Sequence, residues 1–360
     1  MILSSALAGN ETHGYLFHGP SGVGKRTAAR AFAAELLVAG SPDPDNARHR
    51  VEVGTHPDLT WVRPTGAHVM RTEDVAEPVV AAATRTPFES SKRVFVLERV
   101  DTMNDEVANR LLKTLEEPPP FVHLILLTDS LGQVLPTVVS RCQLVRFDRL
   151  PPAQIAAELV GDGTSAEQAT ACAKLSLGNG ANARFLASGE GQELCADVDR
   201  FVGASLSASS VEPEPWRGLL DRAERRRVAA EEKVAEAGAA RVGSEPKGRE
   251  RGAIEKQFED AAKREGRRAQ TEILDLGLTL AGLRYRDLIC LAEGAGDAVL
   301  DPVGAGEIAG GEGSRRDPRR LRMAAELCEA TRLSLELNVT EDLALEALGF
   351  RLRRLVGGDG

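Results

Sequence analysis

The stretch GYLFHGPSGVGKRT, residues 14–27, decides the fold class. Its apolar start, Tyr15–Phe17, is typical of a buried strand, and residues 27–38 have the amphipathic pattern of a helix. Between them stands G-x-x-x-x-G-K, the P-loop pattern, in which glycines turn backbone N–H groups around phosphate oxygens at a helix N-terminus. The pattern predicts a phosphate-binding loop formed by Gly19, Gly22, Gly24 and Lys25.

The residue after the loop lysine departs from this pattern. P-loop NTPases carry Ser or Thr there, because its hydroxyl holds Mg²⁺. This chain carries Arg26, and the next hydroxyl, Thr27, lies about 100° further around the helix. We therefore expect a loop of the right shape, with Thr27 as the available hydroxyl, that binds Mg–ATP poorly.

A second acidic position is altered as well. The apolar run Val94–Leu97 ends in Glu98 and Arg99, where P-loop ATPases carry an Asp that holds Mg²⁺, often followed by a Glu that polarises water. A guanidinium stays protonated and cannot act as a general base. The sequence thus predicts that the chain's own site does not hydrolyse ATP efficiently.

Three further motifs carry a family resemblance. They are GTHPDL at residues 54–59, LLKTLEEPP at residues 111–119 and LPTVVSRCQ at residues 135–143. With them the chain resembles the AAA+ clamp-loader subunits of bacterial DNA polymerase III, and among these the delta-prime type. The resemblance covers residues 14–190. The charged segment further along the chain also looks like the insertions of actinobacterial members.

The resemblance implies roles for single residues. Arg141, in Ser-Arg-Cys, would be an arginine finger that reaches a nucleotide bound by a neighbouring subunit and stabilises the transition state there. Thr128 would occupy the sensor-1 position at the end of its strand. ATP is the ligand that the family implies for the loop residues, including Thr27. The implied partners are the gamma/tau and delta loader subunits, the sliding clamp and primer-template DNA within the assembly.

Zinc is not expected. Relatives carry a four-cysteine zinc module before the G-x-H-P-D stretch, whereas residues 39–53 of this chain contain no cysteine. The two histidines in this part, His49 and His56, make a poor zinc site by themselves.

The expected architecture is an α/β AAA+ P-loop domain with a small helical lid and a C-terminal all-α collar. The predicted boundaries are 1–149 for the P-loop domain, 150–205 for the lid, 206–270 for a charged insertion and 271–360 for the collar. Five short apolar runs predict a buried parallel sheet, namely Tyr15–Phe17, Leu59–Val62, Val94–Leu97, Leu124–Leu127 and Leu144–Phe147. Residues 211–270 hold 13 acidic and 15 basic side chains, which favours a solvated helical or disordered segment.

Composition excludes several classes of protein. A formal net charge of −9 argues against a surface that is basic throughout. Five cysteines without a C-x-x-C pair argue against a cysteine zinc site and for a reducing compartment. The sequence shows no signal peptide and no apolar run of membrane-spanning length, so we expect a cytoplasmic, nucleoid-associated protein without a membrane partner.

Two alternatives to a loader subunit without independent enzymatic activity follow from the P-loop. A catalytically active AAA+ ATPase, either a catalytic loader subunit or a branch-migration motor, should carry a hydroxyl after Lys25 and an Asp-Glu pair at 98–99. A P-loop phosphotransferase of another class should lack the Ser-Arg-Cys motif. The residues present favour the non-catalytic subunit over both.

Overall fold

The computed structural model describes residues 3, 11–39, 41, 43–64, 69–207, 213–242, 249–311, 317–335 and 339–357. The chain divides into two units. The first comprises Met1–Leu150 with Asn179–Ala181, and the second comprises Pro151–Gly178 with Asn182–Gly360.

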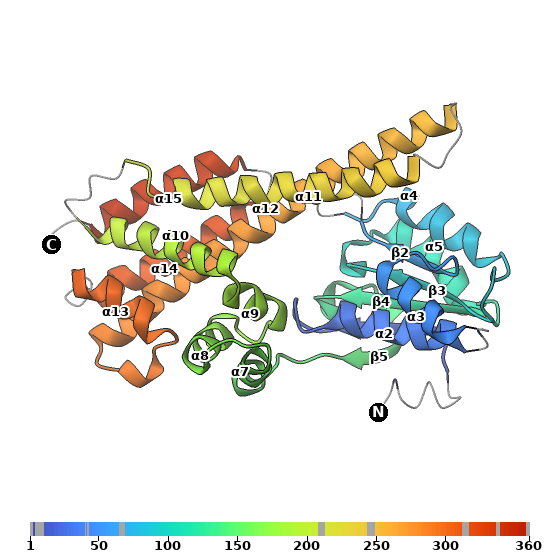
Figure 1. Ribbon diagram of the computed structural model, residues 1–360, viewed down its shortest axis with the longest axis horizontal. Helices are drawn as coiled ribbons and strands as arrows, with labels where there is room; N and C mark the ends of the chain where they lie inside the picture. The colour runs from blue at the N-terminus through green and yellow to red at the C-terminus, as the bar shows by residue number, and fades with distance from the viewer. Residues whose placement is uncertain are drawn as a thin grey trace. The chain divides into compact units, whose positions relative to one another are not determined.

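A five-stranded parallel sheet forms the centre of the first unit (Figure 1). Its strands are β1 (Gly14–His18), β2 (Leu59–Val62), β3 (Arg93–Leu97), β4 (Val122–Thr128) and β5 (Gln143–Arg146), in the order β2-β3-β4-β1-β5. The five apolar runs of the sequence are these strands, so the prediction of a parallel α/β sheet is confirmed. Because every strand runs in the same direction, all carboxyl ends lie at one edge and all amino ends at the other.

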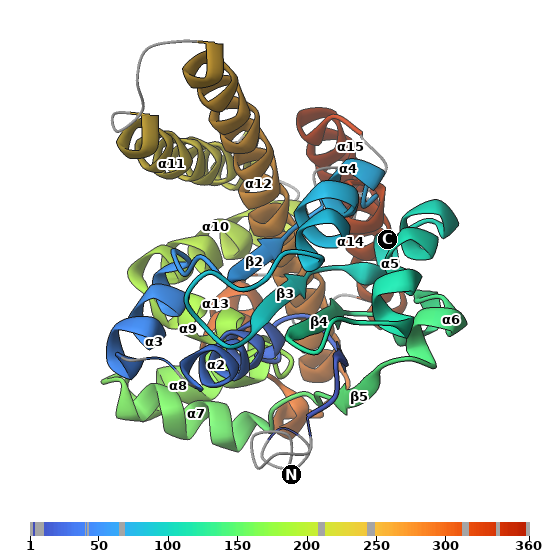
Figure 2. The same ribbon diagram turned by 90° about the vertical axis from the view of Figure 1, so that its right-hand side faces the viewer.

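Helices cover both faces of the sheet (Figure 2). Alternate strand residues such as Phe17 and Val96 pack on one face with α2 (Lys25–Val38) and α3 (Pro44–Val53). Their neighbours, such as Leu16 and Leu97, pack on the other face with four helical elements. These are α4 (Thr72–Val75), the π-helix η1 (Ala76–Ala81), α5 (Asp105–Glu116) and α6 (Pro136–Val139). Burial on both faces explains why the strands read as continuous apolar runs.

The second unit is helical in its described part. Its helices are α7 (Pro152–Gly161), α8 (Ala166–Leu175), α9 (Gly180–Ala187), α10 (Gly189–Leu206), α11 (Arg217–Val242), α12 (Arg249–Ala292), α13 (Pro302–Gly311), α14 (Pro318–Leu335) and α15 (Glu341–Val356). Helix α10 packs against α12 and α15, and α12 packs against α14. A helical C-terminal region is thereby confirmed.

The charged segment forms two long helices that lie side by side, α11 and the first half of α12 (Figures 1 and 2). Helix α12 continues without a break through residue 270, where we expected the collar to begin. The start of the segment is less solvated than its composition predicts, because Trp216 and Arg222 are buried there. Residues 208–212 and 243–248 of the segment lie outside the described residues.

None of the described helices combines the length and the apolarity that a crossing of the bilayer needs.

Candidate functional site

The P-loop residues connect β1 to α2 at the carboxyl edge of the sheet. Gly19, Gly22 and Gly24 have φ angles of 144°, 73° and 92°, in the region that favours glycine. Gly24 is the N-cap of α2, and Lys25 is the first residue of that helix. At Gly19 a side chain is also excluded by space, because a Cβ atom would lie 2.0 Å from the carbonyl oxygen of Phe147.

Lys25 is bound by groups of the chain itself. Its side chain is 7% exposed, and its Nζ lies 2.7 Å from Oδ1 of Asp129. The same ammonium donates to the carbonyl oxygens of Gly19 and Pro20, the latter at 2.6 Å. Asp129 thus supplies the negative charge that a nucleotide phosphate would supply to a P-loop lysine. Asp129 was not among the residues predicted from the sequence, although it follows β4, the strand adjacent to β1, and so lies at the same edge.

Arg26 and Glu98, which both depart from the ATPase pattern, form an ion pair. Nη2 of Arg26 lies 2.6 Å from Oε2 of Glu98. The other carboxylate oxygen accepts from Nε1 of Trp61 at 2.6 Å and from Nε of Arg63 at 3.1 Å. Glu98 is 2% exposed, so its charge requires these partners. The guanidinium of Arg26 therefore meets the carboxylate that a metal ion would meet in an ATPase.

The remaining predicted ligand residues lie nearby but differ in their surroundings. Thr128 is opposite His18 in the strand register. Its Oγ1 donates to Oδ1 of Asp101 at 2.7 Å and accepts from the N–H of Ser130 at 3.1 Å. This hydroxyl is therefore engaged in holding its own loop. Thr27 is exposed in the first turn of α2.

Arg141 lies at the opposite edge of the sheet from the P-loop. It precedes β5, whose residue Gln143 is level with Tyr15 near the start of β1, whereas the loop follows His18 at the end of β1. The carbonyl oxygen of Arg141 lies beside Gly14, four residues before His18, which at about 3.3 Å per residue is roughly 13 Å along the strand direction. The structure therefore does not bring the predicted finger and the predicted loop together.

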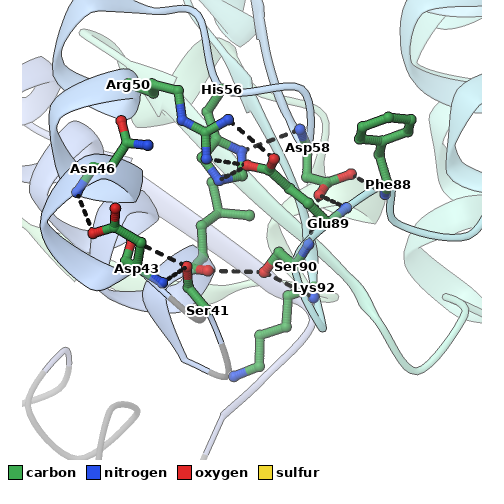
Figure 3. Close-up of polar contacts among 11 residues, drawn as sticks. Ser41, Asp43, Asn46, Arg50, His56, Asp58, Phe88, Glu89, Ser90 and Lys92 are labelled. Atoms are coloured by element: carbon green, nitrogen blue, oxygen red, sulfur yellow. Dashed lines mark hydrogen bonds and ion pairs between the residues drawn. The ribbon is translucent and has the colours of Figure 1, made fainter.

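The residues of the G-x-H-P-D stretch hold a loop of the first unit in place (Figure 3). The buried carboxylate of Asp58 accepts three backbone N–H groups, from Phe88 at 2.6 Å, Glu89 at 3.0 Å and Ser90 at 2.9 Å. His56 accepts from the N–H of Asp58 through Nδ1 at 3.2 Å, and its Nε2 lies 3.2 Å from Glu89. Burial lowers the pKa of His56, and the charge of Arg50 lowers it further against the opposing effect of Glu89.

The described residues contain no group of three or more His, Cys, Asp or Glu side chains arranged to hold a metal ion.

Similarity to known proteins is concentrated in the first unit. Residues 1–151 match the family model described as DNA polymerase III, delta subunit. The chain is 33% identical over 168 residues to DNA polymerase III subunit delta' of Bacillus subtilis, a match that covers 46% of this chain and 50% of that protein. It is 36% identical over 135 residues to DNA polymerase III subunit delta' of Pseudomonas aeruginosa, covering 36% of this chain and 41% of that protein.

The chain therefore matches half or less of the length of these relatives. Among solved structures, a DNA polymerase III gamma subunit-related protein of Thermotoga maritima is similar with a TM-score of 0.43 and 14% identity, covering 98% of this chain and 99% of that chain. Over its first 151 residues the chain is thus similar to the family described as DNA polymerase III, delta subunit, and its similarity to the two delta' subunits falls in part of its length.

Proposed function

We propose that this protein is a clamp-loader subunit of the delta-prime type, which helps load the sliding clamp on primed DNA during chromosomal replication. In this role it contributes Arg141 to the nucleotide site of a neighbouring subunit and does not hydrolyse ATP itself. Its partners would be the gamma/tau and delta subunits, the sliding clamp and primer-template DNA, in the cytoplasm at the nucleoid. Relatives named as tau or gamma subunits support the association with other loader subunits.

The position of Arg141 carries this proposal. An arginine finger stabilises the charge that develops on the transferred phosphoryl group, so it must reach the terminal phosphate of a nucleotide. Arg141 and the chain's own P-loop lie at opposite edges of a parallel sheet. A nucleotide that Arg141 contacts must therefore be bound by another subunit.

The contacts at the chain's own loop support the second part of the proposal. The ammonium of Lys25 is paired with Asp129, and the guanidinium of Arg26 is paired with Glu98. Mg–ATP would have to displace both pairs, and no general base stands at position 99, which is Arg99. These contacts favour a structural role for the loop over a role in ATP hydrolysis.

The test is ATP hydrolysis by the reconstituted loader, stimulated by clamp and primed DNA, with the wild-type chain against Arg141→Ala. Arg110→Ala is the matched control, because Arg110 is half-exposed and paired only with Glu106 on its own helix in the contacts described. We expect the variant to assemble normally and turnover at the affected site to fall by about 10³-fold. The fall in total hydrolysis should be smaller, because the other sites of the loader still turn over. Unchanged turnover would contradict the finger.

Hydrolysis by the isolated chain separates this proposal from the alternative of a catalytically active AAA+ ATPase. We expect no turnover above that of a Lys25→Ala variant. Turnover that depends on Lys25 would favour the active ATPase instead.

A further inference from the structure

The guanidinium of Arg141 is held on two sides within the first unit. Its Nη2 is paired with the carboxylate of Glu116, the last residue of α5. Its Nη1 donates to the carbonyl oxygen of Thr137 at 2.9 Å and lies 3.3 Å from Oγ of Ser140. These groups belong to the two motifs LLKTLEEPP and LPTVVSRCQ, which fifteen residues, 120–134, separate in the sequence.

Apolar packing brings these two motifs together. Leu115 is buried, and Cys142 packs against the same core cluster. Both approach Gly14 at the start of β1, where a Cβ atom would lie 3.2 Å from Leu115 and 3.3 Å from the sulfur of Cys142. Burial raises the pKa of the Cys142 thiol to about 12, so it stays protonated as a packing group. Since Glu116 follows Leu115 and Arg141 precedes Cys142, this packing places the carboxylate beside the guanidinium.

The ion pair between Arg141 and Glu116 is weak enough for Arg141 to exchange the carboxylate for another anion. The side chains of Arg141 and Glu116 are 34% and 46% exposed, so water and salt screen their attraction. A phosphate can bind a guanidinium through two parallel, charge-assisted hydrogen bonds, so it can take the place of a carboxylate. The bonds of Nη1 to Thr137 and Ser140 can persist while Nη2 changes its partner. A carboxylate left beside the incoming phosphate would repel it.

We infer that Glu116 is a positioning residue for Arg141. Its carboxylate holds the guanidinium in the free subunit and competes for it with the terminal phosphate of the nucleotide on the neighbouring subunit. This inference rests on the proposed function, because it requires that Arg141 meets such a nucleotide.

The experiment measures ATP hydrolysis by the reconstituted loader as a function of ATP concentration. Glu116→Gln is compared with the wild type, both in the chain that carries Arg141 and in the Arg141→Ala variant. Glutamine keeps the size and a hydrogen-bond acceptor but removes the competing charge. The control is Glu106→Gln, an exposed residue of the same helix that pairs with Arg110. Turnover at the affected site is taken as the difference in hydrolysis rate between the Arg141 chain and the Arg141→Ala variant.

At that site we expect Glu116→Gln to lower the KM for ATP by about threefold to fivefold at low ionic strength, with kcat changed less than twofold. The shift should shrink as salt is added and should be absent without Arg141. An unchanged or raised KM, or the same shift in the Arg141→Ala background, overturns the inference while leaving the finger intact. If Arg141→Ala does not alter turnover, the proposed function has failed, and the inference falls with it.

Discussion

Nη2 of Arg26 lies 2.6 Å from Oε2 of Glu98, and both residues stand at metal-holding positions where the chain departs from the P-loop ATPase pattern. In an ATPase the two positions hold one metal ion between a hydroxyl and a carboxylate. Here a guanidinium supplies the positive charge, and the buried carboxylate keeps a cationic partner without a metal. The two departures therefore compensate each other electrostatically.

The first prediction concerns Mg²⁺. Because Arg26 is paired with Glu98, the carboxylate at the position that holds the metal in ATPases, we expect ADP to bind the isolated wild-type chain no more tightly in Mg²⁺ than in EDTA. In Arg26→Thr combined with Glu98→Asp, Mg²⁺ should strengthen the binding of ADP. Isothermal titration calorimetry in both buffers is the measurement, and a tenfold effect of Mg²⁺ on the wild type would contradict the prediction.

The second prediction concerns the partner of Lys25. Replacing Asp129 by alanine removes the carboxylate beside the buried ammonium and should raise the affinity for ADP about fivefold. Asp45→Ala is the control, because Asp45 is 98% exposed and pairs only with Arg48 in the contacts described. Affinities follow from titration with a fluorescent ADP analogue. A value for Asp129→Ala equal to that of the control would show that Asp129 does not compete.

The third prediction concerns the stability of the first unit. In Asp58→Ala, three backbone N–H groups lose their buried acceptor, so the free energy of unfolding should fall by about 3 kcal/mol. Asp58→Asn retains one acceptor oxygen and should fall between wild type and alanine. Urea unfolding in a Trp216→Phe background reports this unit through Trp61. A loss below about 1 kcal/mol would mean that water replaces the carboxylate.

The fourth prediction concerns the buried ion pair of the second unit. Asp197 accepts from Nε and Nη2 of Arg222 at 2.8 and 2.6 Å, and the side chain of Arg222 is 5% exposed. Asp197→Ala leaves a buried guanidinium with Glu193 as its remaining described partner and should cost about 3 kcal/mol. Unfolding followed through Trp216 in a Trp61→Phe background measures the loss. Asp221→Ala, which removes a carboxylate 60% exposed, should change little.

The fifth prediction concerns pH. Burial lowers the pKa of His56 in the folded protein below its value of 6.5 in the unfolded chain. The unfolded state therefore binds more protons, so the stability that His56 contributes is present above pH 6.5 and is lost as the pH falls toward its folded pKa. In His56→Asn, whose side chain can still accept the N–H two residues on, this loss should disappear. Unfolding followed through Trp61 between pH 7.5 and 5 tests it, and parallel curves for both proteins would contradict it.

The buried strands and the helices beside them were predictable because their signals are local. Five apolar runs become the five strands, and the glycines of the loop take the φ angles that their residue type permits. The prediction that the charged segment is solvated was less accurate than the prediction of the strands. Composition does not reveal that Arg222 and Trp216 are buried, since Arg222 is paired with Asp197 of α10 and Trp216 packs on Phe350 of α15.

The sequence by itself determined the P-loop turn, the parallel sheet, the family resemblance and the candidate residues, because each depends on neighbours a few positions apart. The tertiary structure alone decided which charges meet. The strand order places Asp129 beside Lys25 and Glu98 beside Arg26, and packing around Gly14 places Glu116 beside Arg141. Such pairs depend on which strand ends share an edge, and hydrophobic periodicity fixes the face of a side chain but not its neighbours across the sheet.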